Sequence, residues 1–327
     1  MSDSLDANDN PEIYRQIEVE LPAEDTLPFV QVLDEGLALP ELSGYYEVLY
    51  DETRPRSADN AVLVLYFPIY SELATAQIEL VLDALGLTRY RISEKKIERQ
   101  DYLQAYKQYY EPFQISPRLL IVPSWDRGGE RERLLRGAEG VNSDARSLYL
   151  DPGLAFGTGK HATTELCLQY LDEVLNDSAT APRELIDAGA GSGILALGAL
   201  LLGAHRVFAF DIDGNAAIAC DQNLRLNPEI AARPGALQFQ HGGFDLPEFT
   251  ARSADLLLGN LTAAVLLHNQ GFIDQARVRR MALSGILTEQ QDQVIAAFET
   301  TGACRWRILP GGIRERDGWV LLEFESR

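Results

Sequence analysis

Apolar and polar positions change their period several times along this chain, and the changes divide it into regular elements. In the first hundred residues, alternation with period two predicts strands, whereas apolar positions three and four apart predict helices. The pattern predicts a strand at 14–21, a helix at 23–37, strands at 43–50 and 61–67, a helix at 71–85 with Ser71 as its N-cap, and a strand at 89–97. The order strand, helix, strand, strand, helix, strand indicates a ferredoxin-like α+β domain.

A second alternation of strands and helices occupies the C-terminal half of the chain. Apolar runs predict strands at 185–187, 207–211, 237–240, 255–260, 280–287, 304–309 and 319–325, with helices at 215–226, 261–275 and 289–300 between them. The segment 310–317 is too short for a crossover helix, so the last two strands should pair antiparallel. The prediction is an α/β fold with a Rossmann-like, seven-stranded sheet whose last strand is antiparallel.

The region between these two halves is polar and contains prolines and glycines. A helix at 99–110 and a short strand at 118–122 are expected, followed by a charged stretch with a helical turn at 131–136. The resulting division is a disordered tail at 1–12, a first domain at 13–123, a linker at 124–146 and a second domain at 147–327. The first domain has no glycine turn, so it should bind a partner, or else serve only for dimerisation.

The first candidate ligand-binding feature is the glycine turn after the strand that ends at Asp187. Its glycines are Gly189, Gly191 and Gly193, in the spacing G-x-G-x-G, whereas a dinucleotide site has G-x-G-x-x-G. Asp187 would repel a pyrophosphate but attract an ammonium group. S-adenosylmethionine carries a nucleoside, a sulfonium and an ammonium without any phosphate, so it fits this turn better than a dinucleotide. Asp211, at the end of the next strand, is placed for the ribose hydroxyls of either ligand.

Three further stretches are candidates for the same site. The loop 150–164 has glycines on both sides of Thr158 and could fold over the ligand, or it could be an ordinary capped loop. The turn 241–244, which contains Gly243, could lie against an adenine ring. Asn260 ends a strand, where its amide could accept an N–H from a substrate amine or merely cap the following helix.

Composition and charge narrow the function classes. The chain has 327 residues and a net charge of −20, which argues against a broad nucleic-acid surface. The charge would suit a basic protein partner, although it could serve only solubility. The three cysteines and four histidines show no metal-ligand spacing, so no metal is expected. The polar N-terminus is not a signal peptide and no apolar run could span a membrane, so a cytoplasmic protein is expected.

Several motifs together resemble one known family. They are Tyr66-Phe67-Pro68, Arg118–Trp125, the loop LDPGLAFGTG followed by His-x-Thr-Thr at 150–164, Asp187–Ala196, Asp211-Ile212-Asp213, Asn260-Leu261 and Leu283–Leu287. Over nearly its whole length the chain is similar to the bacterial methyltransferases that modify ribosomal protein L11 of the large subunit. They belong to the class I S-adenosylmethionine-dependent methyltransferase superfamily, whose sheet is the one predicted above.

The resemblance implies roles for the two domains and for individual residues. The N-terminal domain would recognise ribosomal protein L11, and the C-terminal domain would methylate its lysine or N-terminal amines. Asn260 and the carbonyl of Leu261 would accept N–H bonds from the amine and aim its lone pair. The cofactor would be contacted by Thr164, Gly189, Asp211 and Asn260, with Phe156, Gly157 and Thr158 lining its pocket; the residues themselves add Asp187, Gly191 and Gly243.

Three other functions are still open at this point. The chain could methylate another protein or a small molecule. It could be a nicotinamide-dependent oxidoreductase, although Asp187 and the glycine spacing argue against that. It could also be a binding module without activity, although Asp187, Asp211 and Asn260 are all in place. A monomer without direct nucleic-acid or membrane binding is expected.

Overall fold

The structure is a computed structural model, and it describes residues 13–35, 38–39, 42, 44–47, 60–98, 107, 110–151, 159–176, 181–300 and 306–327. The chain divides into two compact units, residues 1–110 and 111–327. The predicted tail at 1–12 lies outside the described residues, as do Phe156, Gly157 and Thr158. In the described part of the chain, no helix is both long and apolar enough to cross a membrane.

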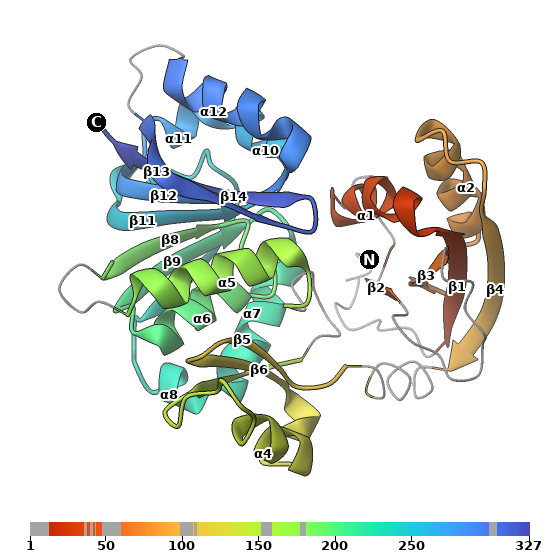
Figure 1. Ribbon diagram of the computed structural model, residues 1–327, viewed down its shortest axis with the longest axis horizontal. Coiled ribbons are helices and arrows are strands. Elements are labelled where there is room, and N and C mark those ends of the chain that lie inside the picture. Colours follow the sequence, from red (N-terminus) through yellow and green to blue (C-terminus); the bar gives the residue numbers. More distant parts are fainter. Residues whose placement is uncertain are drawn as a thin grey trace, which may run out of the picture. The chain divides into compact units, whose positions relative to one another are not determined.

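The first unit has the predicted ferredoxin-like topology, which is confirmed. Its sheet has the order β2-β3-β1-β4, and every neighbouring pair is antiparallel (Figure 1). The elements are β1 (Ile13–Pro22), the 3-10 turn η1 (Ala23–Asp25), α1 (Thr26–Glu35), β2 (Gly44–Glu47), β3 (Asn60–Pro68), α2 (Ala74–Ala84) and β4 (Arg91–Glu98).

Alternation along β1 explains how this unit is held together. Ile17, Val19 and Leu21 are buried on one face, where Phe29 of α1 and Ile78 of α2 join them in one core cluster. The prediction that Ser71 caps α2 is wrong. The helix begins after Leu73, and the Ser71 carbonyl, not its hydroxyl, accepts the N–H of Ala74 at 3.2 Å.

The second unit contains the predicted seven-stranded sheet. Its order is β10-β9-β8-β11-β12-β14-β13; the first five strands run parallel, and β14 is antiparallel to both of its neighbours. The strands are β8 (Glu184–Ala188), β9 (Arg206–Asp211), β10 (Leu237–His241), β11 (Ser253–Asn260), β12 (Arg277–Leu287), β13 (Trp306–Arg316) and β14 (Trp319–Ser326).

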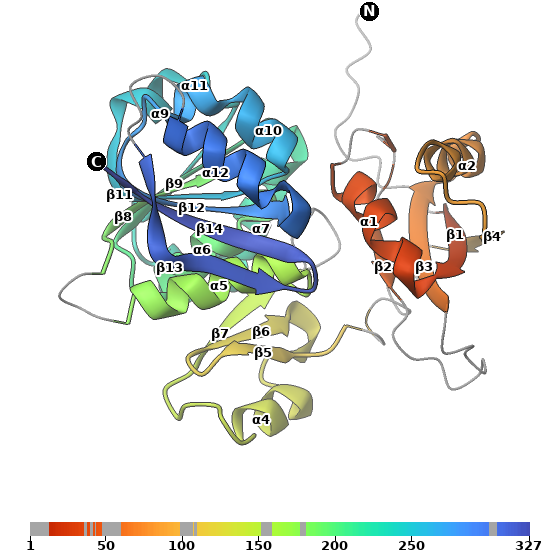
Figure 2. The same cartoon turned by 45° about the horizontal axis from the view of Figure 1, so that its top comes forward.

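Helices cover both faces of this sheet and form two separate apolar clusters with it (Figures 1 and 2). One face carries α5 (Ala162–Val174), α6 (Ile194–Leu202), α7 (Gly214–Leu226) and the short α8 (Pro228–Ala231). The other face carries α9 (Pro247–Ala251), α10 (Ala263–His268), α11 (Gln270–Ile273), η3 (Thr288–Gln290) and α12 (Gln291–Thr300). All nine residues of α6 are buried, so the helix after the glycine turn is fixed in the core.

The stretch expected to be a linker is folded instead. It contains η2 (Ser124–Asp126) and α4 (Glu130–Arg136), and it connects the second and third strands of a three-stranded sheet. The strands are β5 (Phe113–Ser116), β6 (Leu119–Pro123) and β7 (Arg146–Leu150). Because β6 pairs in parallel with β7, both belong to the second unit, so the chain divides after residue 110 and not after 123.

A buried carboxylate explains why this charged stretch can fold. Glu132 is only 3% exposed and accepts hydrogen bonds from the Gly128 amide, the Ser147 hydroxyl, the Tyr149 hydroxyl and the Arg136 guanidinium. These bonds satisfy the charge within the unit. The helical turn expected at 131–136 is thus present as α4, within a stretch that is folded throughout.

The final hairpin is also longer than predicted. The expected loop at 310–317 is mostly part of β13, and a two-residue turn at Asp317 and Gly318 joins it to β14. Both turn residues have positive φ, 51° and 80°, as a tight hairpin turn requires. The run Pro310-Gly311-Gly312, expected in the loop, belongs to β13. It lies where the register of β13 against β14 shifts, between Ile308 and Ile313.

Candidate functional site

The predicted site residues gather because four neighbouring parallel strands end at one edge of the sheet. In sheet order β10, β9, β8 and β11 end at His241, Asp211, Ala188 and Asn260. Ligands of open α/β sheets bind outside such carboxyl ends, next to the turns that follow them. This edge is therefore the candidate active site.

The glycine turn after β8 needs glycine for two separate reasons. Gly189, Gly191 and Gly193 have φ of 73°, 51° and 77°, which side chains other than glycine disfavour. The turn is also closely packed: a Cβ at Gly189 would lie 2.4 Å from Leu261 Cδ2, and one at Gly193 would lie 2.5 Å from Cys220 Sγ. The turn therefore sits between the end of β11 and helix α7.

Asp187 lies beneath this turn and is fully buried. Its Oδ2 accepts the N–H of Ala196, in the first turn of α6, at 3.0 Å, while Oδ1 has no hydrogen-bond partner among the described residues. Burial raises the pKa of Asp187 to about 7, and the nearby charge of Asp211 acts in the same direction. The predicted attraction of an ammonium group would therefore act from below the turn and would depend on pH.

Asp211, the other strand-end acid, accepts a backbone N–H with each of its two carboxylate oxygens. Oδ2 accepts the Gly191 N–H at 2.8 Å, and Oδ1 accepts the Asp213 N–H at 2.9 Å. Each carboxylate oxygen has a second lone pair for a ligand hydroxyl. Asp211 thus holds the glycine turn against the end of β9 and also presents acceptors at the predicted ribose position.

Asn260 and Leu261 stand at the far side of the glycine turn. The Asn260 side-chain Nδ2 donates to Thr164 Oγ1 at 3.4 Å, which brings the first turn of α5 to the end of β11. Leu261 N donates to the Ser284 carbonyl at 3.0 Å. Within the described residues the Leu261 carbonyl accepts no hydrogen bond, so both it and the Asn260 Oδ1 can accept from a ligand.

His161 has a structural role in this edge. Its Nδ1 accepts the Thr163 N–H at 3.4 Å and caps α5, and its ring lies edge-on to Trp319 with centroids 5.0 Å apart. Burial lowers the pKa of His161 to about 4. A neutral histidine with a lowered pKa is a poor proton acceptor at neutral pH, so His161 is poorly suited to act as a catalytic base.

The turn after β10 reaches the same edge. His241 Nε2 is 3.0 Å from the Ile212 carbonyl, and a Cβ at Gly243 would lie 3.4 Å from Ile212 Cγ2. Sequence reasoning missed Ile212, whose side chain is 76% exposed directly after Asp211. An apolar residue just past a strand-end acid was the available signal, and it offers a flat apolar contact for a base.

The glycine loop before α5 is described only from Gly159 onward. Gly159 has a φ of 86°, and a Cβ there would lie 3.0 Å from Ile194 Cδ1, at the start of α6. The loop thus returns to the glycine turn at this point. Roles for Phe156, Gly157 and Thr158 stay predictions because these residues lie outside the described ranges.

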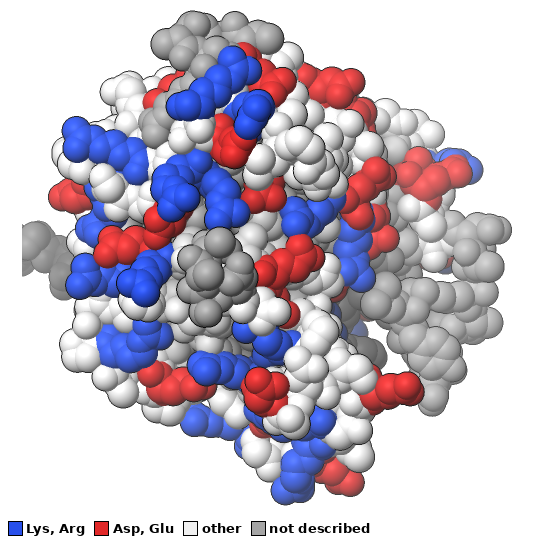
Figure 3. All heavy atoms as spheres, turned by 60° about the vertical axis from the view of Figure 1, so that its left-hand side comes forward, with Lys and Arg blue, Asp and Glu red and all other residues white. Residues whose placement is uncertain are grey.

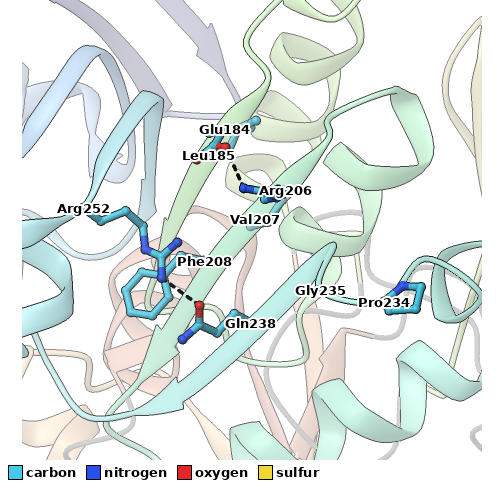
Figure 4. Close-up of a pocket in the computed structure, with 9 residues that line it drawn as sticks. All are labelled: Glu184, Leu185, Arg206, Val207, Phe208, Pro234, Gly235, Gln238 and Arg252. Atoms are coloured by element: carbon cyan, nitrogen blue, oxygen red, sulfur yellow. Dashed lines mark hydrogen bonds and ion pairs between the residues drawn. The ribbon is translucent and has the colours of Figure 1, made fainter.

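A hollow of about 290 Å³ lies at the opposite, amino-terminal edge of the sheet (Figure 4). Arg252 stacks on Phe208, 4.6 Å from the ring centroid, and donates to Gln238 at 2.7 Å, while Arg206 pairs with Glu184 at 3.3 Å. Figure 3 shows that arginine and lysine side chains are frequent on this face, interspersed with acids. Arginines would repel a sulfonium and an ammonium, so this hollow is not the cofactor site proposed below.

Comparisons with known proteins support the interpretation of the sheet and its edge. The family described as "Ribosomal protein L11 methyltransferase (PrmA)" matches residues 26–327. A ribosomal protein L11 methyltransferase of Leptospira interrogans is 32% identical over 324 residues, which cover 96% of this chain and 99% of that protein. One from Azotobacter vinelandii is 39% identical over 232 residues, which cover 70% of this chain and 69% of that protein.

A solved structure is also similar. The crystal structure of a ribosomal protein L11 methylase from Lactobacillus delbrueckii subsp. bulgaricus superposes with a TM-score of 0.51 and 26% identity. It covers 67% of this chain and all of that chain. The fold class predicted from the sequence is confirmed.

Proposed function

Because the chain belongs to the ribosomal protein L11 methyltransferase family, we propose that it transfers methyl groups from S-adenosylmethionine to amines of ribosomal protein L11. The observation that carries this proposal is the pair of candidate amine acceptors, Asn260 Oδ1 and the Leu261 carbonyl, beside the glycine turn. The cytoplasm, where ribosomal proteins are made, is the expected compartment, and a monomer without direct nucleic-acid contacts stays our prediction.

The residues at the edge of the sheet fit S-adenosylmethionine. The glycine turn exposes backbone at positions where any Cβ would collide with its neighbours. Asp187 places an oxygen without a partner below the turn, which suits an ammonium. Asp211 offers lone pairs to ribose hydroxyls, and the exposed Ile212 offers an apolar surface to the base. When bound, this cofactor supplies an electrophilic methyl group.

The protein's main task is to align the amine with that methyl group. Thr164 accepts from the Asn260 Nδ2 and thereby fixes which end of the amide faces the edge, so Oδ1 is left as the acceptor. The Asn260 Oδ1 and the Leu261 carbonyl would together bind two amine hydrogens, so that the lone pair points away from both oxygens and toward the methyl group.

The amine must be neutral before it can attack. A lysine amine has an ordinary pKa of about 10.4, and removal from water lowers it. As the N–C bond forms and the S–C bond breaks, one N–H proton is released to water. No described residue at this edge is needed as a base, because His161 is used to cap α5.

Transfer of a labelled methyl group from S-adenosylmethionine to purified ribosomal protein L11 tests the proposal. Label in this protein, located by mass spectrometry on lysine or N-terminal amines, supports it. Label that enters only another protein or a small molecule would favour the alternative that the chain methylates a different substrate. No label in any acceptor, with cofactor bound, would indicate a silent binding module.

A further inference from the structure

Helix α7 and its C-cap residue, Asn227, carry two buried amides that cover the open edge of β7. On its other edge β7 pairs with β6, so residues 149 and 151 turn their backbone groups toward α7. Asn227 binds both groups of Tyr149: its Oδ1 accepts the N–H at 3.0 Å, and its Nδ2 donates to the carbonyl at 2.7 Å. Asn223, four positions earlier, accepts the Asp151 N–H at 2.9 Å. Both asparagines are 1% exposed.

The two amides differ in what they bind on their other side. The Asn223 Nδ2 donates to the Ser192 carbonyl, inside the glycine turn, at 2.9 Å. The Asn227 Nδ2 donates instead to the carbonyl of Asn223, within its own helix, at 2.7 Å. Only Asn223 therefore links the end of β7 to the glycine turn, across separations of 72 and 31 residues.

A second contact supports the turn from the same helix. Cys220, three residues before Asn223, lies close to Gly193. A Cβ added to Gly193 would be 2.5 Å from the Sγ of Cys220. The side chains of residues 220 and 223 share one face of α7, since positions three apart are neighbours on a helix. The glycine turn is thus held on its outer side by packing at Gly193 and by a hydrogen bond at Ser192.

We propose that Asn223 is a positioning residue for cofactor binding: its amide fixes the glycine turn in the shape that receives S-adenosylmethionine by tying Ser192 to Asp151. This inference rests on the cofactor site proposed above. Asn223 itself touches no ligand, and it acts through the turn.

The physical reason is the energy of a buried carbonyl. Without the Asn223 amide, the Ser192 carbonyl would lose its donor in a buried place, and the turn would be free to move toward another donor or water. If only about one molecule in ten then keeps the binding-competent shape, the apparent affinity falls about tenfold. Saturating cofactor selects that shape again, so the chemical step is affected little.

The test measures cofactor affinity by calorimetry, together with KM and kcat for methyl transfer, in Asn223→Ala, Asn223→Asp and Asn227→Ala. Asn227 is the matched control, because it has the same residue type and burial and caps the C-terminus of the same helix, while its hydrogen bonds to Tyr149 and Asn223 do not reach the turn. Asn223→Asp keeps an acceptor for Asp151 N–H and loses only the donor to Ser192. Its added negative charge would by itself favour a cationic ligand, so weaker binding in this variant cannot come from charge.

We expect Asn223→Ala and Asn223→Asp to raise the Kd and KM for the cofactor about tenfold while kcat changes less than twofold. Asn227→Ala should lower the thermal midpoint at least as much and leave the cofactor Kd within twofold. An unchanged Kd in a folded Asn223→Asp protein, or an equal rise in Asn227→Ala, would overturn the proposal. Failure of the wild-type protein to bind the cofactor would instead overturn the function on which it rests.

Discussion

Asn260 donates a hydrogen bond from its side-chain amide to Thr164 Oγ1 across 3.4 Å, although 96 residues separate the two in the chain. The bond joins the carboxyl end of β11 to the first turn of α5, and the 1% exposed Thr164 keeps its place through burial in that helix. One partner thus holds the Nδ2 end of the amide, and its oxygen accepts no hydrogen bond among the described residues. In the proposed reaction, this oxygen is an acceptor for the incoming amine.

The clearest consequence concerns Asn260→Ala. Removal of the acceptor leaves the amine unaligned, which should lower kcat for methyl transfer about 100-fold, while the Kd for S-adenosylmethionine rises far less. Kinetics and calorimetry on the same preparation measure the two effects. Asn269→Ala is a suitable control, since that amide donates to the Val265 carbonyl of the helix that Asn269 caps, and its rates should match those of the wild type. Normal turnover in Asn260→Ala would refute the assigned role.

A second prediction concerns the backbone beside Leu261. Gly285 has a φ of 81°, and a Cβ there would lie 2.5 Å from the Leu261 carbonyl oxygen, which belongs to rigid backbone. Gly285→Ala should therefore destabilise the protein by about 3 kcal/mol and also displace an amine acceptor. Urea unfolding of the variant gives the stability, and labelled methyl transfer gives the loss of rate.

Gly271 provides the comparison, because a Cβ there meets nothing within 4 Å and the residue lies in helix α11. Gly271→Ala should stabilise the protein by about 0.5 kcal/mol and leave transfer unchanged. Equal effects of the two substitutions would show that the close approach at Gly285 has no importance.

The pKa of Asp187 predicts a pH dependence with a definite sign. Burial raises this pKa from 3.8 to about 7, so the native state holds the proton more tightly than the unfolded state. The contribution to stability is therefore complete below about pH 4 and is lost as the pH rises to about 7. Asp187→Asn should remove that dependence, so the variant gains in stability over the wild type across this interval. Chemical unfolding at several pH values measures the gain.

The same group predicts how cofactor binding responds to pH. An ammonium favours the ionised carboxylate, so the wild-type Kd for S-adenosylmethionine should fall as the pH rises through about 7, with proton release. Calorimetry in buffers of different ionisation enthalpy detects the proton. Asp187→Asn should bind S-adenosylmethionine more weakly, with a Kd that does not depend on pH. If the wild-type Kd does not change with pH either, Asp187 does not interact with the ammonium group of the cofactor.

Helix α2 provides a test of the first unit as the substrate-recognition domain. Leu73, the residue before α2, and Leu80 within α2 are 68% and 69% exposed. If the first unit recognises ribosomal protein L11, exposed apolar side chains such as these are candidates for the contact. We expect the double substitution Leu73→Ser and Leu80→Ser to raise the KM for ribosomal protein L11 about tenfold and to leave the cofactor Kd unchanged.

Leu134, which is 67% exposed on α4 of the second unit, is the control for that experiment. Leu134→Ser should leave both constants as in the wild type. A dimer that dissociates in the α2 variant, with an unchanged KM, would favour the alternative that the first unit only dimerises.

Sequence patterns predicted most of the fold, and the errors have physical causes. The ferredoxin-like order and the seven strands follow from apolar patterns that the structure confirms: burial alternates along β1, whereas β8 and α6 are buried as continuous apolar runs. The helical turn expected at 131–136 is α4, but the order of the whole stretch at 124–146 was not predicted, because Glu132 is held by the hydroxyls of Ser147 and Tyr149, and composition does not reveal such distant contacts. The full length of β13 was not predicted, because glycines such as Gly311 and Gly312 occur both in loops and at irregularities within strands.

At the site, the sequence predicted which residues lie at the carboxyl edge of the sheet, but it did not predict how deeply each of them is buried. Asp187 and Asp211 were both expected at strand ends, and both are there, yet only the structure shows that Asp187 lies under the turn. Its burial depends on how α6 begins, which a glycine spacing does not reveal. Asn223 was missed for a similar reason, because an asparagine within a helix resembles a solvent-facing residue until its partners, Ser192 and Asp151, are known.

One titration tests the central claim most directly: calorimetry of the wild-type protein with S-adenosylmethionine and, separately, with NADH. The account predicts saturable binding of one S-adenosylmethionine per chain at the carboxyl edge and no heat with the pyrophosphate coenzyme, since Asp187 and the G-x-G-x-G turn favour a cation over a phosphate. Binding of NADH without binding of S-adenosylmethionine would contradict it.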